Sequence, residues 1–392
     1  MSAGGEQKWR RGVRVIDAAS IATEDAPQIA GKPNEARSSV ERRDYLELAA
    51  GGLRMPVGAH LLLHEQPDPD TIIVDGRRLG QVVEKAARTF RTPLAVPLMD
   101  LTIEKTALLE MLGVPADAIG TYHLTPDRAD ERLAVVQGRM ATHRNRRLDA
   151  TCGAIQYIAR ATSLVPIGMV IGPWSLVVKL LRDPITALYM AGRGRTAGEN
   201  PQVALLERTL ELATRTILWS IERQLAAGAR AMFVCEPAAS TAYISPRQLA
   251  AGAKLLERFV LVPNRRIKQR LTEAGCELIF HCCGELTPEF IRTFVQLDPV
   301  ILSLGSSRTL WEDAALVSKS IVLYGNLPTK SFYSDEVCPV ARVEAMAREL
   351  VGRMRATGHP FILGSECDVL SVPGAHETIR RKVDAFMNVQ VE

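Results

Sequence analysis

Short apolar runs that alternate with helical stretches constrain the fold of this chain most strongly. The runs predicted to form strands cover residues 54–64, 93–98, 165–171, 231–234, 278–280, 300–304, 321–323 and 361–363. Helical connections between consecutive strands force parallel pairing, and about eight such units close naturally into a barrel. An open doubly wound sheet is the alternative, but it usually has a glycine-rich phosphate-binding turn after its first strand, and Gly58 alone does not make one. The sequence therefore predicts an α/β fold, a (β/α)8 TIM barrel.

The stretches between these runs indicate the domain organisation. Helices are predicted at residues 39–50, 77–89, 104–112, 203–227, 246–274 (in two pieces, broken at Pro263) and 375–387. Residues 116–145 are charged and poorly periodic, which suggests a helical insertion, folded as a hairpin over one end of the barrel. Residues 1–40 are polar without sustained periodicity and are predicted to be an N-terminal extension. The barrel domain is then expected to span residues 41–392.

Composition argues against several classes of protein. The net charge is only +4, with arginines mixed among acidic residues, so no nucleic-acid surface is expected. No apolar stretch reaches about 18 residues and no secretory signal is evident, so neither a membrane span nor secretion is expected. Seven cysteines, an odd number at irregular spacing, indicate a reducing compartment. A cytoplasmic enzyme is the expectation; the oligomeric state stays open, and a homo-oligomer is compatible with the sequence.

Three residues that can bind a metal stand at the ends of predicted strands. His281 and Cys283 close the apolar run that begins near Cys276, and Cys367 closes the run at 361–364. In a parallel barrel the carboxyl ends of the strands gather on one face, where active sites lie. One imidazole and two thiolates converging there would form a three-ligand Zn²⁺ site with its fourth position open to a reactant.

Other interpretations of these residues remain open. His281 and Cys283 could be a buried histidine beside a small apolar thiol. Side chains at positions i and i+2 of a strand point the same way, so Cys282 is expected on the opposite face, in the packing. If Cys282 instead reached the metal, four protein ligands would close a structural zinc site. His60 and His64, predicted on one face of the first strand, could hold a second metal, although packed or surface histidines are the commoner case.

Five segments resemble one known superfamily. They are Val165-Pro166-Ile167 with Gly172-Pro173, Glu236-Pro237-Ala238-Ala239-Ser240, Phe280-His281-Cys282-Cys283-Gly284, Tyr324-Gly325-Asn326-Leu327 and Leu363-Gly364-Ser365-Glu366-Cys367-Asp368. Together they resemble the uroporphyrinogen decarboxylase superfamily, over a region from about Arg42 to Met387. The three metal positions resemble its cobalamin-dependent methyltransferase branch.

The sequence departs from this superfamily in two places. Uroporphyrinogen decarboxylases carry an arginine-rich stretch near the first strand for substrate carboxylates, whereas residues 61–66 contain no arginine, so porphyrinogen decarboxylation is not expected. Some zinc methyltransferases place a glutamate after the sixth strand, where this chain has Leu304-Gly305-Ser306-Ser307. The fourth zinc ligand is therefore left open between water, substrate and a carboxylate such as Glu236 or Glu366.

The resemblance implies a methyltransferase that moves a methyl group between a corrinoid and a thiol or other small acceptor bound at Zn²⁺. The chain has no Asp-x-His-x-x-Gly stretch, so cobalamin is expected on a separate corrinoid protein or free. Glu236 and Asp100, each at a strand end, are candidate catalytic residues, and Tyr243 and Asn326 are candidates to line the mouth and contact the cofactor. A metal-free decarboxylase, in which the three metal positions are incidental, is the alternative function.

Overall fold

The strands of the barrel form one continuous parallel order. The computed structural model describes residues 40–126 and 129–390. Its strands are β1 (Arg54–Val57), β2 (Leu94–Ala95), β3 (Val165–Ile171), β4 (Ala231–Cys235), β5 (Glu277–Cys282), β6 (Ile301–Leu304), β7 (Val322–Leu327) and β8 (Phe361–Asp368). They pair in parallel in the order β1-β8-β7-β6-β5-β4-β3-β2, so that β8 returns to lie beside β1 while β1 and β2 are the two ends of the order. Eight parallel strands in this order, curled so that β8 lies beside β1, agree with the predicted (β/α)8 barrel.

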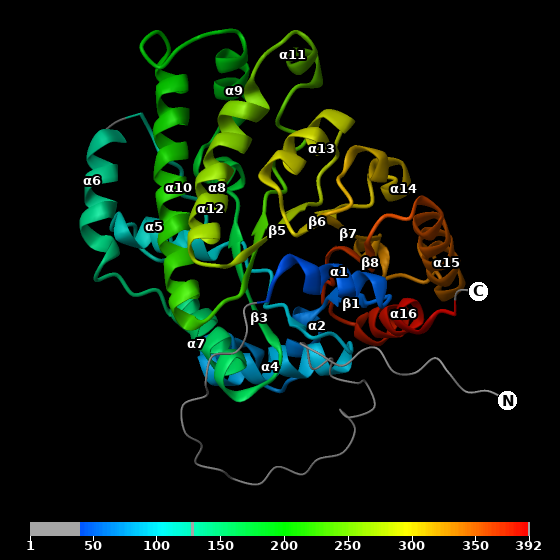
Figure 1. The fold of residues 1–392 in the computed structure, drawn as a ribbon. Coiled ribbons are helices and arrows are strands. Elements are labelled where there is room, and N and C mark those ends of the chain that lie inside the picture. Colours follow the sequence, from blue (N-terminus) through cyan, green and yellow to red (C-terminus); the bar gives the residue numbers. More distant parts are fainter. Residues whose placement is uncertain (1–39, 127–128, 391–392) are drawn as a thin grey trace, which may run out of the picture. The chain divides into compact units, whose positions relative to one another are not determined.

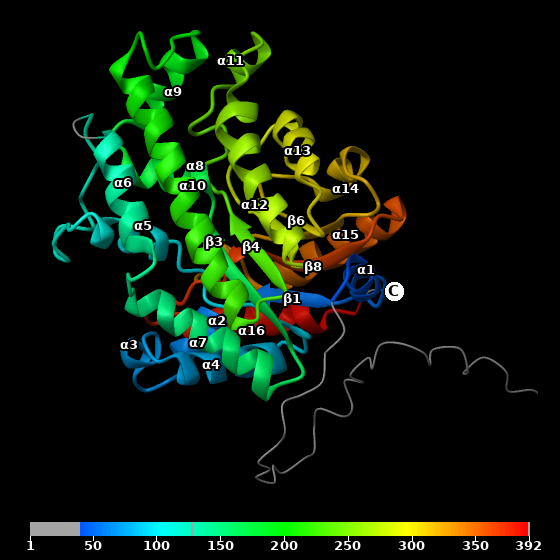
Figure 2. The same ribbon diagram turned by 60° about the vertical axis from the view of Figure 1, so that its left-hand side comes forward.

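Helices lie around the outside of the sheet (Figures 1 and 2). They are α1 (Arg42–Ala50), α2 (Ala59–Leu63), α3 (Pro69–Ile72), α4 (Gly76–Thr89), α5 (Ile103–Met111), α6 (Ala129–Met140), α7 (Arg146–Ala161), α8 (Pro173–Leu180), α9 (Pro184–Gly192), α10 (Pro201–Ala227), α11 (Pro246–Ala250), α12 (Val262–Glu273), α13 (Pro288–Phe294), α14 (Leu310–Asp313), α15 (Val340–Thr357) and α16 (His376–Asn388). In the described part of the chain, no helix is both long enough and apolar enough to cross a bilayer.

Sequence signals set the ends of the long helix α10. The Asn200 side chain accepts hydrogen bonds from the backbone N–H groups of Gln202 and Val203, and Pro201 occupies the first turn, where its missing N–H costs little. Gly228 ends the helix at φ 108°, a left-handed conformation that favours glycine. The helix therefore begins and ends close to the predicted 203–227.

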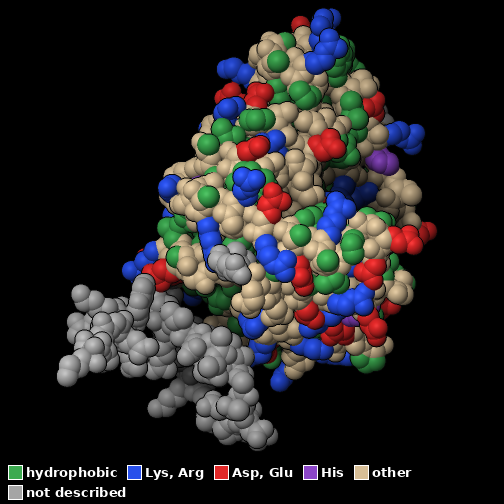
Figure 3. Space-filling view, turned by 90° about the vertical axis from the view of Figure 1, so that its right-hand side faces the viewer, with side chains coloured by type: hydrophobic (Ala, Val, Ile, Leu, Met, Phe, Trp, Pro, Cys, Tyr) green, Lys and Arg blue, Asp and Glu red, His purple; other side chains and the backbone are tan. Residues whose placement is uncertain are grey.

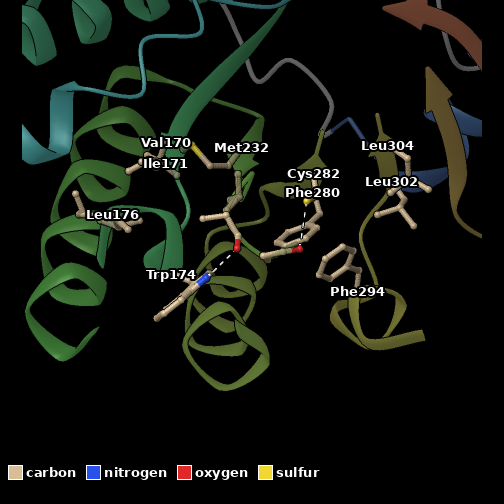
Figure 4. Close-up of a cluster of buried hydrophobic side chains, with 14 of the residues drawn as sticks. Val170, Ile171, Trp174, Leu176, Met232, Phe280, Cys282, Phe294, Leu302 and Leu304 are labelled. Atoms are coloured by element: carbon tan, nitrogen blue, oxygen red, sulfur yellow. Dashed lines mark hydrogen bonds between the residues drawn. The ribbon is translucent and has the colours of Figure 1, made fainter. Parts of the chain in front are cut away.

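Alternate residues of each strand pack on opposite sides of the sheet. Phe233, Ile279 and Tyr324 belong to a cluster inside the barrel, whereas Met232 and Phe280 pack outward with the helices (Figure 4). This alternation is the normal period of a strand, and it decides which residues after Phe280 can face the interior.

The structure corrects the predicted first and second strands. β1 ends at Val57, and the segment from Gly58 turns into the short helix α2, so His60 and His64 do not lie on a strand. The leucine run at 61–63 is buried as part of a helix. The prediction of a strand was wrong here because an apolar run of this length does not distinguish helix from strand. The second strand covers only Leu94–Ala95 of the predicted 93–98.

Two further differences concern helices. The predicted insertion at 116–145 contains one helix, α6, among its described residues rather than a hairpin. Helix α7, which follows it, was not predicted; Asn145 caps it by accepting from the N–H of Leu148. α7 packs so closely on α4 that a Cβ on Gly76 would lie 2.7 Å from the Gly153 Cα.

The predicted N-terminal extension lies outside the described residues, apart from Val40.

The charged side chains on the surface are mixed in sign, as the sequence predicted. On the face shown in Figure 3, basic and acidic side chains are interspersed. Ion pairs among the described residues include Arg42–Asp298 at 2.8 Å and Arg348–Glu344 at 2.8 Å.

Candidate metal centre

His281 lies on the interior side of β5 with one ring nitrogen engaged and the other free. Nδ1 is 2.8 Å from Ser303 Oγ on the neighbouring strand β6, and the ring packs against Phe233 at a centroid distance of 5.6 Å. Nε2 is buried and has no hydrogen-bond partner. A buried polar atom without a partner is costly, so Nε2 is the atom that a metal ion would satisfy.

Cys283 and Cys367 complete a cluster with His281. The ligand atoms of the three residues all lie within 4.8 Å of one another, and they form the one group of at least three potential metal-ligating side chains in the described residues. Cys283 follows β5, whereas Cys367 is on β8, which pairs with β7 and β1 rather than β5. The barrel thus brings together the three residues that the sequence predicted, at the carboxyl ends of the strands.

The two thiols shift each other's pKa in opposite directions. A hydrogen bond with Cys367 is the main reason that the pKa of Cys283 falls to about 7, and Lys330 lowers it further. The same hydrogen bond and burial raise the pKa of Cys367. One sulfur of the pair is therefore prepared to be a thiolate near neutral pH, the form in which cysteine binds a metal.

Cys282 points away from this cluster, as predicted. It is fully buried in the outer packing layer, and its Sγ donates to the carbonyl oxygen of Ala239 at 3.5 Å (Figure 4). A closed site with Cys282 as the fourth ligand would require β5 to turn its outward side chain to the interior.

Glu236 is held at the amino end of helix α8. Its Oε1 accepts from the Ser175 N–H at 2.5 Å, and its Oε2 accepts from the Trp174 N–H at 3.4 Å and from Asn264 Nδ2 at 3.1 Å. Gly172 is required beside it, since a Cβ there would lie 2.0 Å from Oε2. Burial raises the pKa of Glu236 to about 7. These contacts make the carboxylate an anchor for α8; its predicted catalytic role stays a prediction.

Asp100 forms an ion pair with Arg147. The Arg147 Nη2 lies 2.9 Å from Asp100 Oδ2, and Thr102 donates to Oδ1 through both N–H and hydroxyl. Burial acts to raise the pKa of Asp100, but these hydrogen bonds outweigh it and hold the pKa below its ordinary value. The Arg147 side chain is four-fifths buried.

Asn326 lies near the end of β7, and Tyr243 lies in the segment between β4 and α11. The Asn326 side chain donates to the carbonyl oxygens of Gly305 and Arg308, both at 2.8 Å, so it fixes the loop after β6. Tyr243 is half-buried and packs against the outer apolar cluster. Their cofactor-binding role stays a prediction.

A polar group lies beside the cysteines, and of its members the sequence had indicated Glu366 and His60 but not Lys330 or Asp368. Glu366 accepts from Ser306 Oγ at 2.5 Å and from the Lys330 N–H at 3.3 Å, and the Lys330 ammonium lies 4.0 Å from it. His60 Nδ1 lies 2.5 Å from Asp368 Oδ2. Asp368 ends β8 and Lys330 follows β7 by three residues, both beyond the predicted strands at 361–363 and 321–323, so only their order after a strand could have indicated them.

A pocket lies at the other end of the barrel. Its volume is about 460 Å³, and Arg54, His359 and Phe361 line it at the starts of β1 and β8. It is separate from the cysteines, which lie where these strands end.

Comparison with known proteins agrees with the fold. The chain is similar in structure to a methyltransferase from Methanosarcina mazei, with a TM-score of 0.58 and 15% sequence identity over 88% of this chain and 98% of that one. No curated protein matches the sequence. The family model described as uroporphyrinogen decarboxylase (URO-D) matches residues 84–388, well over half of the chain. The chain therefore belongs to the uroporphyrinogen decarboxylase family.

Proposed function

We propose that this protein is a zinc-dependent methyltransferase, which moves a methyl group between a corrinoid and a thiol or other small nucleophile bound at zinc. The observation that carries the proposal is the convergence of His281, Cys283 and Cys367, with ligand atoms within 4.8 Å of one another at the barrel mouth. The buried, unpartnered Nε2 of His281 supports it further.

The donor set suits Zn²⁺. One imidazole nitrogen and two thiolates are preferred zinc ligands, and three protein ligands leave a position for a reactant, as in catalytic sites. Ser303 orients the imidazole through Nδ1, the kind of outer contact that fixes a metal-bound histidine. Zn²⁺ bound here would lower the pKa of an acceptor thiol, so that the thiol is nucleophilic near neutral pH.

Residues of the chain would prepare the site for this chemistry. The Lys330 ammonium favours the thiolate form of Cys283, because it acts to lower the pKa of that thiol. Lys330 is in turn held near Glu366, whose carboxylate is fixed by Ser306. Loss of a proton from the cysteine pair would then accompany metal uptake.

The corrinoid would come from outside this chain. No Asp-x-His-x-x-Gly stretch is present in the sequence, so we expect cobalamin to arrive free or on a corrinoid protein. The resemblance in fold to a methyltransferase is consistent with the proposal. The competing candidate, a metal-free decarboxylase, is favoured by the family's description and predicts an active protein without zinc.

The test combines zinc analysis with a transfer assay. The purified full-length protein is incubated with methylcobalamin and a panel of thiols, and the corrinoid is followed by absorbance. We expect thiol-dependent demethylation that is lost with zinc and restored when zinc is added back. Unchanged turnover in zinc-free protein would contradict the proposal, and decarboxylation of a tetrapyrrole acid without zinc would support the alternative.

A further inference from the structure

A methionine stands beside the three predicted zinc ligands. Met99 follows the short strand β2, and its side chain is half-buried against the cluster inside the barrel. Its Sδ lies 3.7 Å from Cys367 Sγ. The Met99 sulfur therefore contacts the cluster from the segment after β2, which supplies none of the three ligands.

The sulfur–sulfur distance matches the spacing of two ligands on one zinc ion. With Zn–S bonds of about 2.3 Å and tetrahedral angles, two sulfur ligands lie about 3.8 Å apart. The observed 3.7 Å between Met99 Sδ and Cys367 Sγ agrees with this value. This spacing is compatible with both sulfurs binding one ion.

Nearby carboxylates accept hydrogen bonds from other groups. Glu366 is bound by Ser306 and the Lys330 N–H, and Asp368 Oδ2 by His60, while Asp368 Oδ1 is buried without a hydrogen-bond partner. Glu236 is bound at the start of α8. Among the described residues, neither Glu366 nor Asp368 joins the group of ligand atoms within 4.8 Å of one another.

We propose that the Met99 thioether is the fourth, exchangeable donor of the metal centre. This inference rests on the proposed function, because it takes the ion to be zinc. A thioether is neutral and binds Zn²⁺ less strongly than a thiolate, so an entering thiol would replace it. In that exchange the bond to Sδ breaks, the bond to the entering sulfur forms and the thiol proton passes to solvent, with no change of oxidation state. The unbranched methionine side chain can move aside without disturbing β2.

X-ray absorption at the zinc edge tests the proposal on the full-length, zinc-loaded protein. We expect three sulfur neighbours and one nitrogen in the wild type, and two sulfurs in Met99→Leu, which keeps the side-chain volume. Met169→Leu is the matched control, because Met169 also packs inside the barrel on β3 but belongs to no ligand group. It should keep three sulfurs.

A second measurement does not depend on the variant folding. In wild-type protein made with selenomethionine, we expect a selenium neighbour at the zinc, which disappears when 2-mercaptoethanol is added and a sulfur takes its place. Bound zinc with two sulfurs and no selenium neighbour would overturn the role of Met99 while leaving the proposed function intact. A wild type that binds no zinc would instead refute the proposed function, and with it this inference.

Discussion

The buried carboxyl group of Glu104 gives a measurable prediction about stability and pH. Glu104 lies on α5, where its Oε1 accepts from Ser220 Oγ at 2.8 Å while Oε2 is buried without a partner. Burial raises its pKa from 4.5 to about 7. Because the folded protein holds this proton more tightly than the unfolded chain, its contribution to stability is fully present below pH 4.5 and is lost as the pH rises through about 7.

The magnitude follows from the width of that window. Each pH unit between the two pKa values changes the free energy of unfolding by about 1.4 kcal/mol, so about 3 kcal/mol is lost between pH 4.5 and pH 7. Glu104→Gln removes the ionisable group. Relative to the wild type, the variant should therefore gain about 3 kcal/mol when the pH is raised from 4.5 to 8.

Urea unfolding of both proteins at a series of pH values measures this difference. Ser220→Ala provides a matched comparison, because the Ser220 hydroxyl acts to lower the pKa of Glu104. Its removal should enlarge the loss of stability with rising pH. A constant difference between Glu104→Gln and the wild type across the range would refute the reasoning that Glu104 is protonated by burial.

Three further predictions concern the parts that hold the site. Gly305→Ala should reduce zinc binding, because a Cβ there would lie 2.8 Å from the Cys283 backbone. The control Gly138→Ala should bind zinc normally, since no atom lies within 4 Å of its added Cβ. Equal zinc affinities of the two variants in a chelator competition would contradict this prediction. Glu236→Gln should lower the unfolding temperature without reducing zinc content, because an amide NH₂ would face the donors at the start of α8; lost turnover with unchanged stability would instead favour a catalytic role. Lys382→Met should cost about 2 kcal/mol in urea unfolding, since the buried ammonium bonds the carbonyls of Phe332 and Ser334, both at 2.8 Å; an unchanged midpoint would show that this contact contributes nothing.

The sequence predicted the parts of the fold that obey local rules. Strand β3 and the two ends of α10 carry their signals within a few residues, and the structure has them where the pattern indicated. Residues 54–64 were predicted as one strand, but the leucine run within them forms a helix. A short apolar run packs equally well as strand or helix, and its tertiary contacts determine which one forms.

The candidate site was predictable to a similar extent. His281 and Cys283 face inward and Cys282 outward because a strand alternates, which the sequence alone indicates. The position of Met99 beside Cys367 depends on the course of the irregular segment after β2. The contacts of Glu236 with α8 depend on the packing between successive units. Neither the position of Met99 nor the contacts of Glu236 can be recognised from a single sequence.

The most direct test of the central claim is the zinc content of the purified protein and of two variants. With His281, Cys283 and Cys367 on one ion, the wild type should contain about one zinc per chain. Cys283→Ala and Cys367→Ala should each lose zinc and methyl transfer together, while Cys276→Ala, a buried cysteine outside the cluster, should keep both. Zinc and activity retained in either ligand variant would contradict the account.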